Sequence, residues 1–191
     1  MSNIFRVIGI TGMPGSGKSE LARIGKDFGY TIVIMGDVIR QKVREEGKEP
    51  TPENCNLMMQ ELRRRHGPNA VALATVAEIE KISKEGKNKF IIDGIRSQDE
   101  VDTFRKKFDD AFSVLAVHAD SKFRFNRLKE RKRSDAPTTI EEFNRRDQVE
   151  LSVGLGEAIA YANYMIENNS NIEEFKKKVY DFFNHFEQVE K

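Results

Sequence analysis

The chain has 191 residues, of which 33% are charged and 38% hydrophobic, and 32 basic against 31 acidic residues give a formal net charge of +1. This length favours one well-buried domain, and the balanced charge excludes a global field that would attract bulk nucleic acid or an anionic membrane. The single cysteine, Cys55, excludes an intramolecular disulfide, and the apolar runs are too short for a signal peptide or a membrane span. We therefore expect a cytoplasmic protein whose polyanion sites are local.

The first feature along the chain is a glycine-rich loop between a strand and a helix. Apolar residues from Ile4 to Ile10 predict a buried strand, and Glu20 to Asp27 predict a helix. A complete GxxxxGK[ST] motif lies between them and consists of Gly12, Met13, Pro14, Gly15, Ser16, Gly17, Lys18 and Ser19. Strand, loop and helix occur in the order that a phosphate-binding loop requires, so we interpret this segment as a nucleotide-binding site.

The residue types of this loop suit a triphosphate and its metal ion. Glycines let successive backbone N–H groups turn toward phosphates, and the helix start adds unpaired donors and a positive dipole end. Lys18 has the length to contact the β- and γ-phosphates, and the Ser19 hydroxyl suits Mg²⁺, whose other ligands are mostly water and phosphate oxygens. We expect ATP and Mg²⁺ as cofactors, although the motif does not identify the base of the triphosphate.

The remaining apolar segments predict the fold class. Strands are expected at Thr31 to Met35, Phe90 to Ile92, Phe112 to Val117 and Tyr164 to Ile166, separated mostly by helix-like stretches. Strands that alternate with helices indicate an α/β fold with a parallel sheet covered on both faces. The last segment carries an apolar stripe at helical spacing that we assign to the core: Ile172, Phe175, Val179, Phe182, Phe183 and Phe186.

Charged residues follow two of the predicted strands. Gly36-Asp37-Val38-Ile39-Arg40 comes after the second strand, and Asp93-Gly94-Ile95-Arg96 comes after the third. Ligands of open parallel sheets collect beyond the carboxyl ends of the strands, on the side of the phosphate loop. Asp93 is suited to order Mg²⁺ or its water as a Walker-B-type acid. Arg40 and Arg96 would bring permanently charged, planar donors toward an anion.

A basic run follows the fourth strand. It consists of Arg124, Arg127, Arg131, Lys132 and Arg133, and after an interruption at Pro137 come Arg145, Arg146 and Asp147. Such a run fits an RNA-binding face, a solvated helix, or the lid of a phosphoryl-transfer enzyme, whose arginines neutralise the transferred group and exclude water. We prefer the lid and take Arg131 as its candidate catalytic arginine, although spacing alone does not identify the essential one.

Taken together, these motifs resemble the P-loop nucleoside monophosphate kinase group. Over nearly its whole length the chain is most similar to an archaeal adenylate-kinase-related, dephospho-CoA-kinase-like family. The segments that carry the resemblance are GMPGSGKSE at Gly12 to Glu20, MGDVIR at Met35 to Arg40, DGIRS at Asp93 to Ser97, RSDAPTTIEEFNRRDQVE at Arg133 to Glu150 and GLGEAIAYANYMIENN at Gly154 to Asn169. The resemblance implies a three-layer α/β/α P-loop kinase fold with a five-strand parallel sheet, a helical acceptor-binding insertion at about 36–86 and a short lid at about 124–147.

The resemblance also implies roles for single residues. MGDVIR is similar to the GD-x-x-R stretch of adenylate kinase, whose arginine grips the acceptor phosphate, and this implies that role for Arg40. DGIR resembles the adenylate kinase DGFPR stretch, but its arginine, Arg96, falls one residue early and the proline is missing. The ending ANYMIENN is similar to dephospho-CoA kinases and implies that the loop from Asn168 to Asn171, with Asn169, lies by the donor adenine.

Within the predicted insertion, the run Arg63-Arg64-Arg65-His66 fits two interpretations equally well. It would either line the acceptor site or cover an exposed helix face.

We interpret the chain as an ATP- and Mg²⁺-dependent kinase that transfers the γ-phosphoryl group to a nucleotide-like acceptor, either a nucleoside monophosphate or dephospho-CoA. A phosphate acceptor is already a nucleophile and needs arginines and positioning. A hydroxyl acceptor needs a carboxylate that takes its proton, and Asp37 is the candidate. The alternative is a nucleotide-binding switch or assembly ATPase on the same fold, whose basic run would dock a protein or RNA partner.

Overall fold

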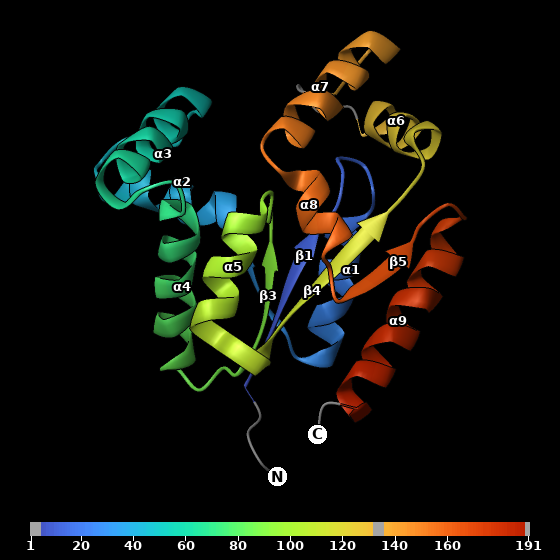
Figure 1. Ribbon diagram of the computed structural model, residues 1–191, viewed down its shortest axis with the longest axis horizontal. Coiled ribbons are helices and arrows are strands. Elements are labelled where there is room, and N and C mark those ends of the chain that lie inside the picture. Colours follow the sequence, from blue (N-terminus) through green and yellow to red (C-terminus); the bar gives the residue numbers. More distant parts are fainter. Residues whose placement is uncertain (1–4, 132–135, 190–191) are drawn as a thin grey trace.

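The computed structural model describes residues 5–131 and 136–189, and its centre is a five-strand sheet (Figure 1). The strands are β1 (Arg6–Thr11), β2 (Thr31–Ile34), β3 (Lys89–Asp93), β4 (Phe112–His118) and β5 (Tyr164–Glu167). Their order is β2-β3-β1-β4-β5, and every neighbouring pair is parallel. The predicted α/β fold with a five-strand parallel sheet is confirmed. Ile4, which we placed in the first strand, lies outside the described residues.

Helices cover both faces of this sheet, which gives the three predicted layers (Figure 1). The main helices are α1 (Lys18–Gly25), α2 (Met35–Glu45), α3 (Pro52–His66), α4 (Ala70–Ser83), α5 (Gln98–Phe108), α6 (Ser121–Glu130), α7 (Ile140–Ser152), α8 (Leu155–Ala160) and α9 (Ile172–Val189), with short 3₁₀ turns η1 (Lys26–Phe28) and η2 (Asp109–Ala111). Helices α1 and α9 pack together on one face, and α4, α5 and α8 lie on the other. In the described part of the chain, no helix combines the length and the apolar character needed to cross a membrane.

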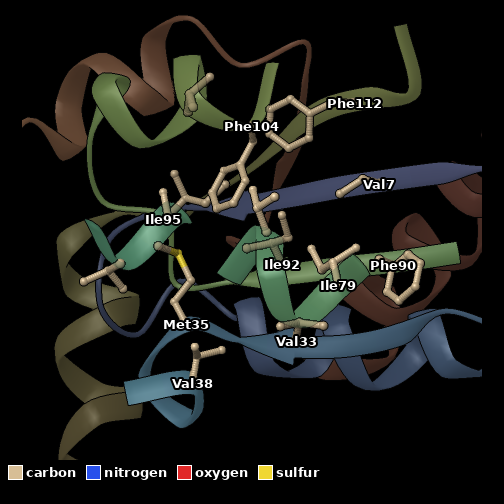
Figure 2. Packing of buried hydrophobic residues seen from close by; sticks show 14 of the residues in the cluster. Val7, Val33, Met35, Val38, Ile79, Phe90, Ile92, Ile95, Phe104 and Phe112 are labelled. Carbon is tan, nitrogen blue, oxygen red and sulfur yellow. The ribbon is translucent and has the colours of Figure 1, made fainter. Parts of the chain in front are cut away.

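Each face of the sheet has its own hydrophobic core, because successive strand residues point to opposite faces. Figure 2 shows the core under α4 and α5, where Phe90 and Ile92 of β3 pack with Phe104 and Phe112.

The second core contains the apolar stripe of α9. Phe175, Val179, Phe183 and Phe186 are buried there and Phe182 is partly buried, as predicted. Ile172 does not belong to this core. It is the first residue of α9 and its side chain is 52% exposed, so its assignment to the core was wrong.

A cluster of charged and polar groups connects α9 to the amino-terminal ends of the strands. The Glu187 carboxylate lies 2.8 Å from Nη1 of the buried Arg6 and accepts hydrogen bonds from Lys89 Nζ at 2.6 Å and Tyr30 Oη at 2.8 Å. Burial would raise the pKa of Glu187, but the hydrogen bonds from Lys89 and Tyr30 and the charges of Lys89 and Arg6 outweigh it and hold the pKa below its usual value.

We expect Glu187→Gln to lower the free energy of unfolding by about 2 kcal/mol at neutral pH, because charged hydrogen bonds to a half-buried carboxylate are lost. The lowered pKa gives a pH signature. The contribution of Glu187 is complete above its ordinary pKa of 4.5 and disappears as the pH falls through the lower folded value. Urea unfolding from neutral to strongly acidic pH should therefore show the difference between variant and wild type shrinking to nothing. The control is Glu173→Gln on the same helix, whose side chain is 76% exposed. An equal effect of both substitutions would show that the cluster contributes no special stability.

The strand register brings the predicted site segments to one edge of the sheet. Ile10 of β1 and Ile34 of β2 both lie opposite Asp93 of β3. The phosphate loop, the start of α2 and Asp93 therefore emerge side by side at the carboxyl ends of the strands. Above this edge, α3 rises on one side and α7 on the other (Figure 1).

Candidate active site

The glycine-rich loop connects β1 to α1 through backbone conformations that require glycine. Gly12 and Gly17 have φ angles of 145° and 115°. A Cβ at Gly12 would lie 2.4 Å from the carbonyl oxygen of Val117, and a Cβ at Gly17 would lie 2.4 Å from Nδ2 of Asn168. At both positions a side chain is excluded by the positive φ angle and by the close approach of neighbouring atoms, which explains the need for glycine there.

The centre of the loop retains unsatisfied polar groups that fit an anionic ligand. Ser16 is fully buried, and among the described residues its Oγ has no hydrogen-bond partner. The loop runs directly into α1, whose first backbone N–H groups have no partner within the helix. Phosphate oxygens accept hydrogen bonds from both kinds of donor, so the loop fits the phosphates of a nucleotide.

Lys18 is folded back onto this loop. Its Nζ donates to the carbonyl oxygens of Gly12 at 2.6 Å and Met13 at 3.2 Å. Burial lowers the pKa of Lys18 from 10.5 to about 8, and the charges of Asp93 and Glu150 offset this only in part. The nearby carboxylates therefore do not fully compensate the burial of the ammonium group, and a bound phosphate would stabilise its charge.

A cavity of about 460 Å³ opens beside Lys18. It is bounded by the phosphate loop, α2, α3, the segment after β3 and α7. Its described lining contains twice as many cationic side chains as carboxylates, so the cavity fits a ligand with several negative charges. The cations are Lys18, Arg40, Arg63, Arg96, Arg131 and Arg146, and the carboxylates are Asp93, Glu100 and Glu150.

Asp93 lies at the end of β3, on the wall of the cavity. Burial raises its pKa, and the positive charges of Lys18 and Arg96 act in the opposite direction. In the described ranges no cluster of three or more His, Cys, Asp or Glu side chains forms a cage for a metal ion. A Mg²⁺ ion fits this arrangement nonetheless, because it commonly uses one or two protein ligands together with water and phosphate oxygens. Ser19 and Asp93 are the residues that would hold it.

Arg40 and Asp37 lie one turn apart at the start of α2, and only Arg40 lines the cavity. Arg40 donates from Nε to Asp37 Oδ1 at 2.8 Å, and its Nη2 lies 2.6 Å from the same oxygen. The Asp37 side chain is 56% exposed. Arg40 therefore faces the cavity while it is paired with Asp37. The role of Asp37 as a proton acceptor stays a prediction.

The three consecutive arginines of α3 have different surroundings. Arg64 and Arg65 form ion pairs with Glu61 at 2.7 and 2.5 Å on the exposed side of the helix. Arg63 lines the cavity instead, and its charge acts on the carboxylate of Glu100. Arg64 and Arg65 therefore cover an exposed helix face, as one interpretation predicted, and that Arg63 lines an acceptor site stays a prediction.

The arginines of the basic run after β4 also have different surroundings. Arg124 is buried and forms a two-pronged ion pair with Asp147 of α7, at 2.8 and 2.5 Å. Arg127 donates from Nη2 to the carbonyl oxygen and Oδ1 of Asn168, both at 3.0 Å. Arg131 reaches the cavity. The three arginines therefore support α7, hold the loop after β5 and face the site, respectively. Lys132, Arg133 and Asp135 lie outside the described residues.

The loop after β5 contacts the phosphate loop through Asn168. The Asn168 side chain donates from Nδ2 to the carbonyl oxygen of Ser16 at 2.7 Å. The neighbouring Asn169 instead donates to Glu167 at 2.8 Å, and its Oδ1 accepts from the backbone N of Asp120. The loop therefore lies beside the phosphate loop, which it contacts through Asn168, and its position by the donor adenine stays a prediction.

Sequence reasoning did not single out two carboxylates of the cavity. Glu100 closes the start of α5, because its Oε2 accepts from the backbone N of Arg96 at 2.8 Å while its own backbone N donates to Ser97 Oγ. The spacing Ser97-x-x-Glu100 is typical of a capping box and was a usable signal. Glu150 follows Arg146 by four residues, so the helical spacing of α7 would have placed both on one face.

Comparison with known proteins identifies the family. A family model described as an AAA domain matches residues 11–144. A UPF0200 protein from Hyperthermus butylicus is 44% identical over 170 residues, covering 89% of each chain. Another from Methanosarcina mazei is 39% identical over 183 residues, covering 96% of each chain. The chain belongs to the UPF0200 family and contains an AAA domain.

Solved structures show that this UPF0200 protein has the P-loop kinase fold. TT1252 from Thermus thermophilus matches with a TM-score of 0.64 at 19% identity, over 95% of this chain and 98% of that one. A dephospho-CoA kinase from Campylobacter jejuni matches with a TM-score of 0.59 at 10% identity, over 97% and 98% of the two chains. A shikimate kinase from Acinetobacter baumannii matches with a TM-score of 0.58 at 12% identity, over 96% and 94%. The family and the fold support the prediction of a P-loop phosphotransferase.

Proposed function

We propose that this UPF0200 protein is an ATP- and Mg²⁺-dependent kinase that transfers the γ-phosphoryl group to a small, nucleotide-like acceptor. The observation that carries the proposal is the position of the phosphate loop on the wall of a cation-rich cavity. Lys18 of the loop faces the same space as Arg40 of α2 and Arg63 of α3. A donor phosphate and an acceptor can thus be held side by side in one cavity, which is the main requirement of phosphoryl transfer.

The donor half would use the phosphate loop and the loop after β5. Backbone N–H groups from Gly12 to Ser19 would bind the β- and γ-phosphates, with Lys18 released from its carbonyl partners to join them. Bound Mg²⁺, held by Ser19 and Asp93, would neutralise part of the phosphate charge. The loop from Asn168 to Asn171 would lie beside the adenine.

The acceptor half would use the insertion at about 36–86, and the segment at about 124–147 would act as the lid. The acceptor side of the cavity is apolar at Ile39, Cys55, Met59 and Val71 and ends in arginines. This combination suits a flat or apolar group joined to an anion, as in a nucleoside monophosphate or dephospho-CoA. Arg131, on the lid, would cover the transferred group. A cytoplasmic location belongs to the same proposal, because ATP and such acceptors are available there.

The test is a panel of acceptors incubated with purified protein, ATP and Mg²⁺. AMP, GMP, CMP, UMP and dephospho-CoA are compared for ADP release and for a phosphorylated product. We expect ADP release that depends on at least one acceptor. Slow hydrolysis that no acceptor changes, together with stimulation by a protein or RNA partner, would support the nucleotide switch instead. The structure gives that alternative little support, because Arg124 and Arg127 of the basic run contact the protein itself.

The metal assignment predicts a selective effect of Asp93→Asn. Because the substitution removes a charge but preserves the shape, we expect Mg²⁺-dependent turnover to fall by roughly 10²-fold while metal-free nucleotide binding changes little. Turnover is measured across a Mg²⁺ titration, and binding is measured by calorimetry in chelator. Asp99→Asn, on the exposed first turn of α5, is the control. Parallel losses of binding and turnover would show that Asp93 supports the loop and not the metal.

Cys55 provides a reporter of acceptor binding that does not depend on catalysis. It is the only cysteine of the chain and lines the acceptor side of the cavity. At an acceptor concentration of ten times Kd, alkylation by iodoacetamide should slow roughly tenfold, since only free protein reacts. Arg63→Ala should weaken this protection, whereas Arg64→Ala, beside it on the exposed face, should not. Alkylation that no productive acceptor slows would place the acceptor elsewhere.

A further inference from the structure

The cavity contains one carboxylate that has no role in the proposed donor site. Glu150 lies on α7, its side chain is only 14% exposed, and it lines the cavity next to Lys18 and Arg96. Its Oε1 lies 3.8 Å from Arg96 Nη1, beyond hydrogen-bond distance. Within the described part of the chain, no side chain or backbone group donates a hydrogen bond to this carboxylate. Glu150 is thus paired with Arg96 only at ion-pair distance, and its oxygens can still accept a hydrogen bond from a ligand.

The other carboxylates near the site have closer partners or another proposed role. Asp37 is 56% exposed, is ion-paired with Arg40 and does not line the cavity. Glu100 accepts from the backbone N of Arg96 and closes the start of α5. Asp93 is the carboxylate suited to the metal. Glu150 is the carboxylate that remains.

The surroundings of Glu150 in the cavity limit the roles that its carboxylate can have. Glu150 lines the same cavity as Lys18 and lies 3.8 Å from Arg96, so it faces the space in which the proposed transfer would take place. Arg146 precedes Glu150 by one helical turn and also lines the cavity. Helix α7 thus presents one cation and one anion to the same space. Beside two phosphate-bearing ligands a bare carboxylate is repelled, unless one ligand offers it a hydrogen-bond donor. A hydroxyl group is such a donor, whereas an ionised acceptor phosphate is not.

We propose that Glu150 accepts the proton of an acceptor hydroxyl, and that the attacking group of the acceptor is consequently this hydroxyl and not a phosphate oxygen. This inference rests on the proposed kinase function and names its acceptor class. The hydroxyl oxygen forms a bond to the γ-phosphorus, and the bond from that phosphorus to the β,γ-bridging oxygen breaks. Its electron pair leaves with ADP, and the hydroxyl proton moves to a Glu150 carboxylate oxygen. The product is a phosphate monoester.

The linkage of the product tests the inference on the unmodified protein. AMP, GMP, CMP and UMP each carry both a terminal phosphate and free hydroxyls, so one compound offers both chemistries, whereas both phosphates of dephospho-CoA are already esterified and it offers only hydroxyls. Phosphorus NMR distinguishes a new monoester from a new diphosphate. We expect a monoester from whichever compound reacts. A diphosphate would overturn the inference while leaving the kinase proposal intact, and the absence of any transferred phosphoryl group would refute both.

Variants of Glu150 test the residue itself. With the reactive acceptor, Glu150→Gln should reduce kcat by roughly 10²- to 10⁴-fold with a much smaller change in KM, as expected for loss of a general base. Glu150→Asp, which keeps the carboxylate, should recover part of kcat. Glu141→Gln, at an exposed position on the same helix, is the matched control. Turnover within tenfold of wild type in Glu150→Gln, or a large loss in Asp37→Asn alone, would overturn the assignment. A loss confined to KM or thermal stability would identify Glu150 as a support for Arg96 and would overturn it too.

Discussion

Lys18→Ala should reduce ATP-dependent phosphoryl transfer by roughly 10²- to 10³-fold, because it removes the cation that we propose contacts the transferred phosphoryl group. The loop itself should persist. Its shape depends on glycine backbone conformations and on packing against Asn168. The measurement is kcat/KM for ATP with the reactive acceptor, together with the thermal midpoint as a check on folding.

The control for Lys18→Ala is Lys26→Ala. Lys26 begins the 3₁₀ turn that follows α1 and is exposed, so its removal should leave turnover unchanged. Near-normal turnover in a folded Lys18→Ala protein would contradict the donor site and with it the proposed function.

Arg124→Met should have the largest effect on stability, a loss of about 3 to 5 kcal/mol in the free energy of unfolding. The Arg124 guanidinium is buried over the ring of Phe143, with 4.8 Å from its Cζ to the ring centroid, and pairs with Asp147, whose side chain is 15% exposed. Methionine preserves much of the apolar stem but leaves the Asp147 carboxylate without its partner. Arg124 also donates to the carbonyl oxygens of Ala119 and Pro14, so α6, α7 and the phosphate loop lose a common support.

Urea unfolding of the single and double variants separates the ion pair from simple packing. Replacing both partners, as in Arg124→Met with Asp147→Leu, should recover part of the stability, because no uncompensated charge is then buried. Arg145→Met, at an exposed position of α7, should change stability by less than about 0.5 kcal/mol. An unfolding midpoint of Arg124→Met equal to that of wild type would mean that this pair does not hold α7 in place.

The amino-acid sequence alone determined the features that depend on local pattern. The inner strands β1, β3 and β4 are mostly apolar, because a parallel strand buried on both faces disfavours polar side chains. The phosphate loop is equally local, because its conformation follows from the spacing of glycines within eight residues. For these reasons the α/β fold, the donor loop and most of the stripe on α9 could be predicted. Ile172 was misplaced, since periodicity does not show where a helix passes the edge of the core.

Only the tertiary structure decided between side chains of the same type. Arg124, Arg127 and Arg131 follow each other at helical spacing, yet one is buried against α7, one holds Asn168 and one faces the cavity. Their surroundings come from segments distant in sequence, so local pattern has no information about them.

The same limit explains the remaining differences at the site. Consecutive residues that leave a strand point in different directions, which separates Asn168 from Asn169. Glu150 belongs to the cavity because α7 is folded back over the carboxyl edge of the sheet, about 57 residues after Asp93 in the sequence. Residue type and spacing in the sequence indicate which side chains could take part in a reaction. Which of them lie together in the cavity depends on burial and proximity, and these arise from contacts across the whole chain.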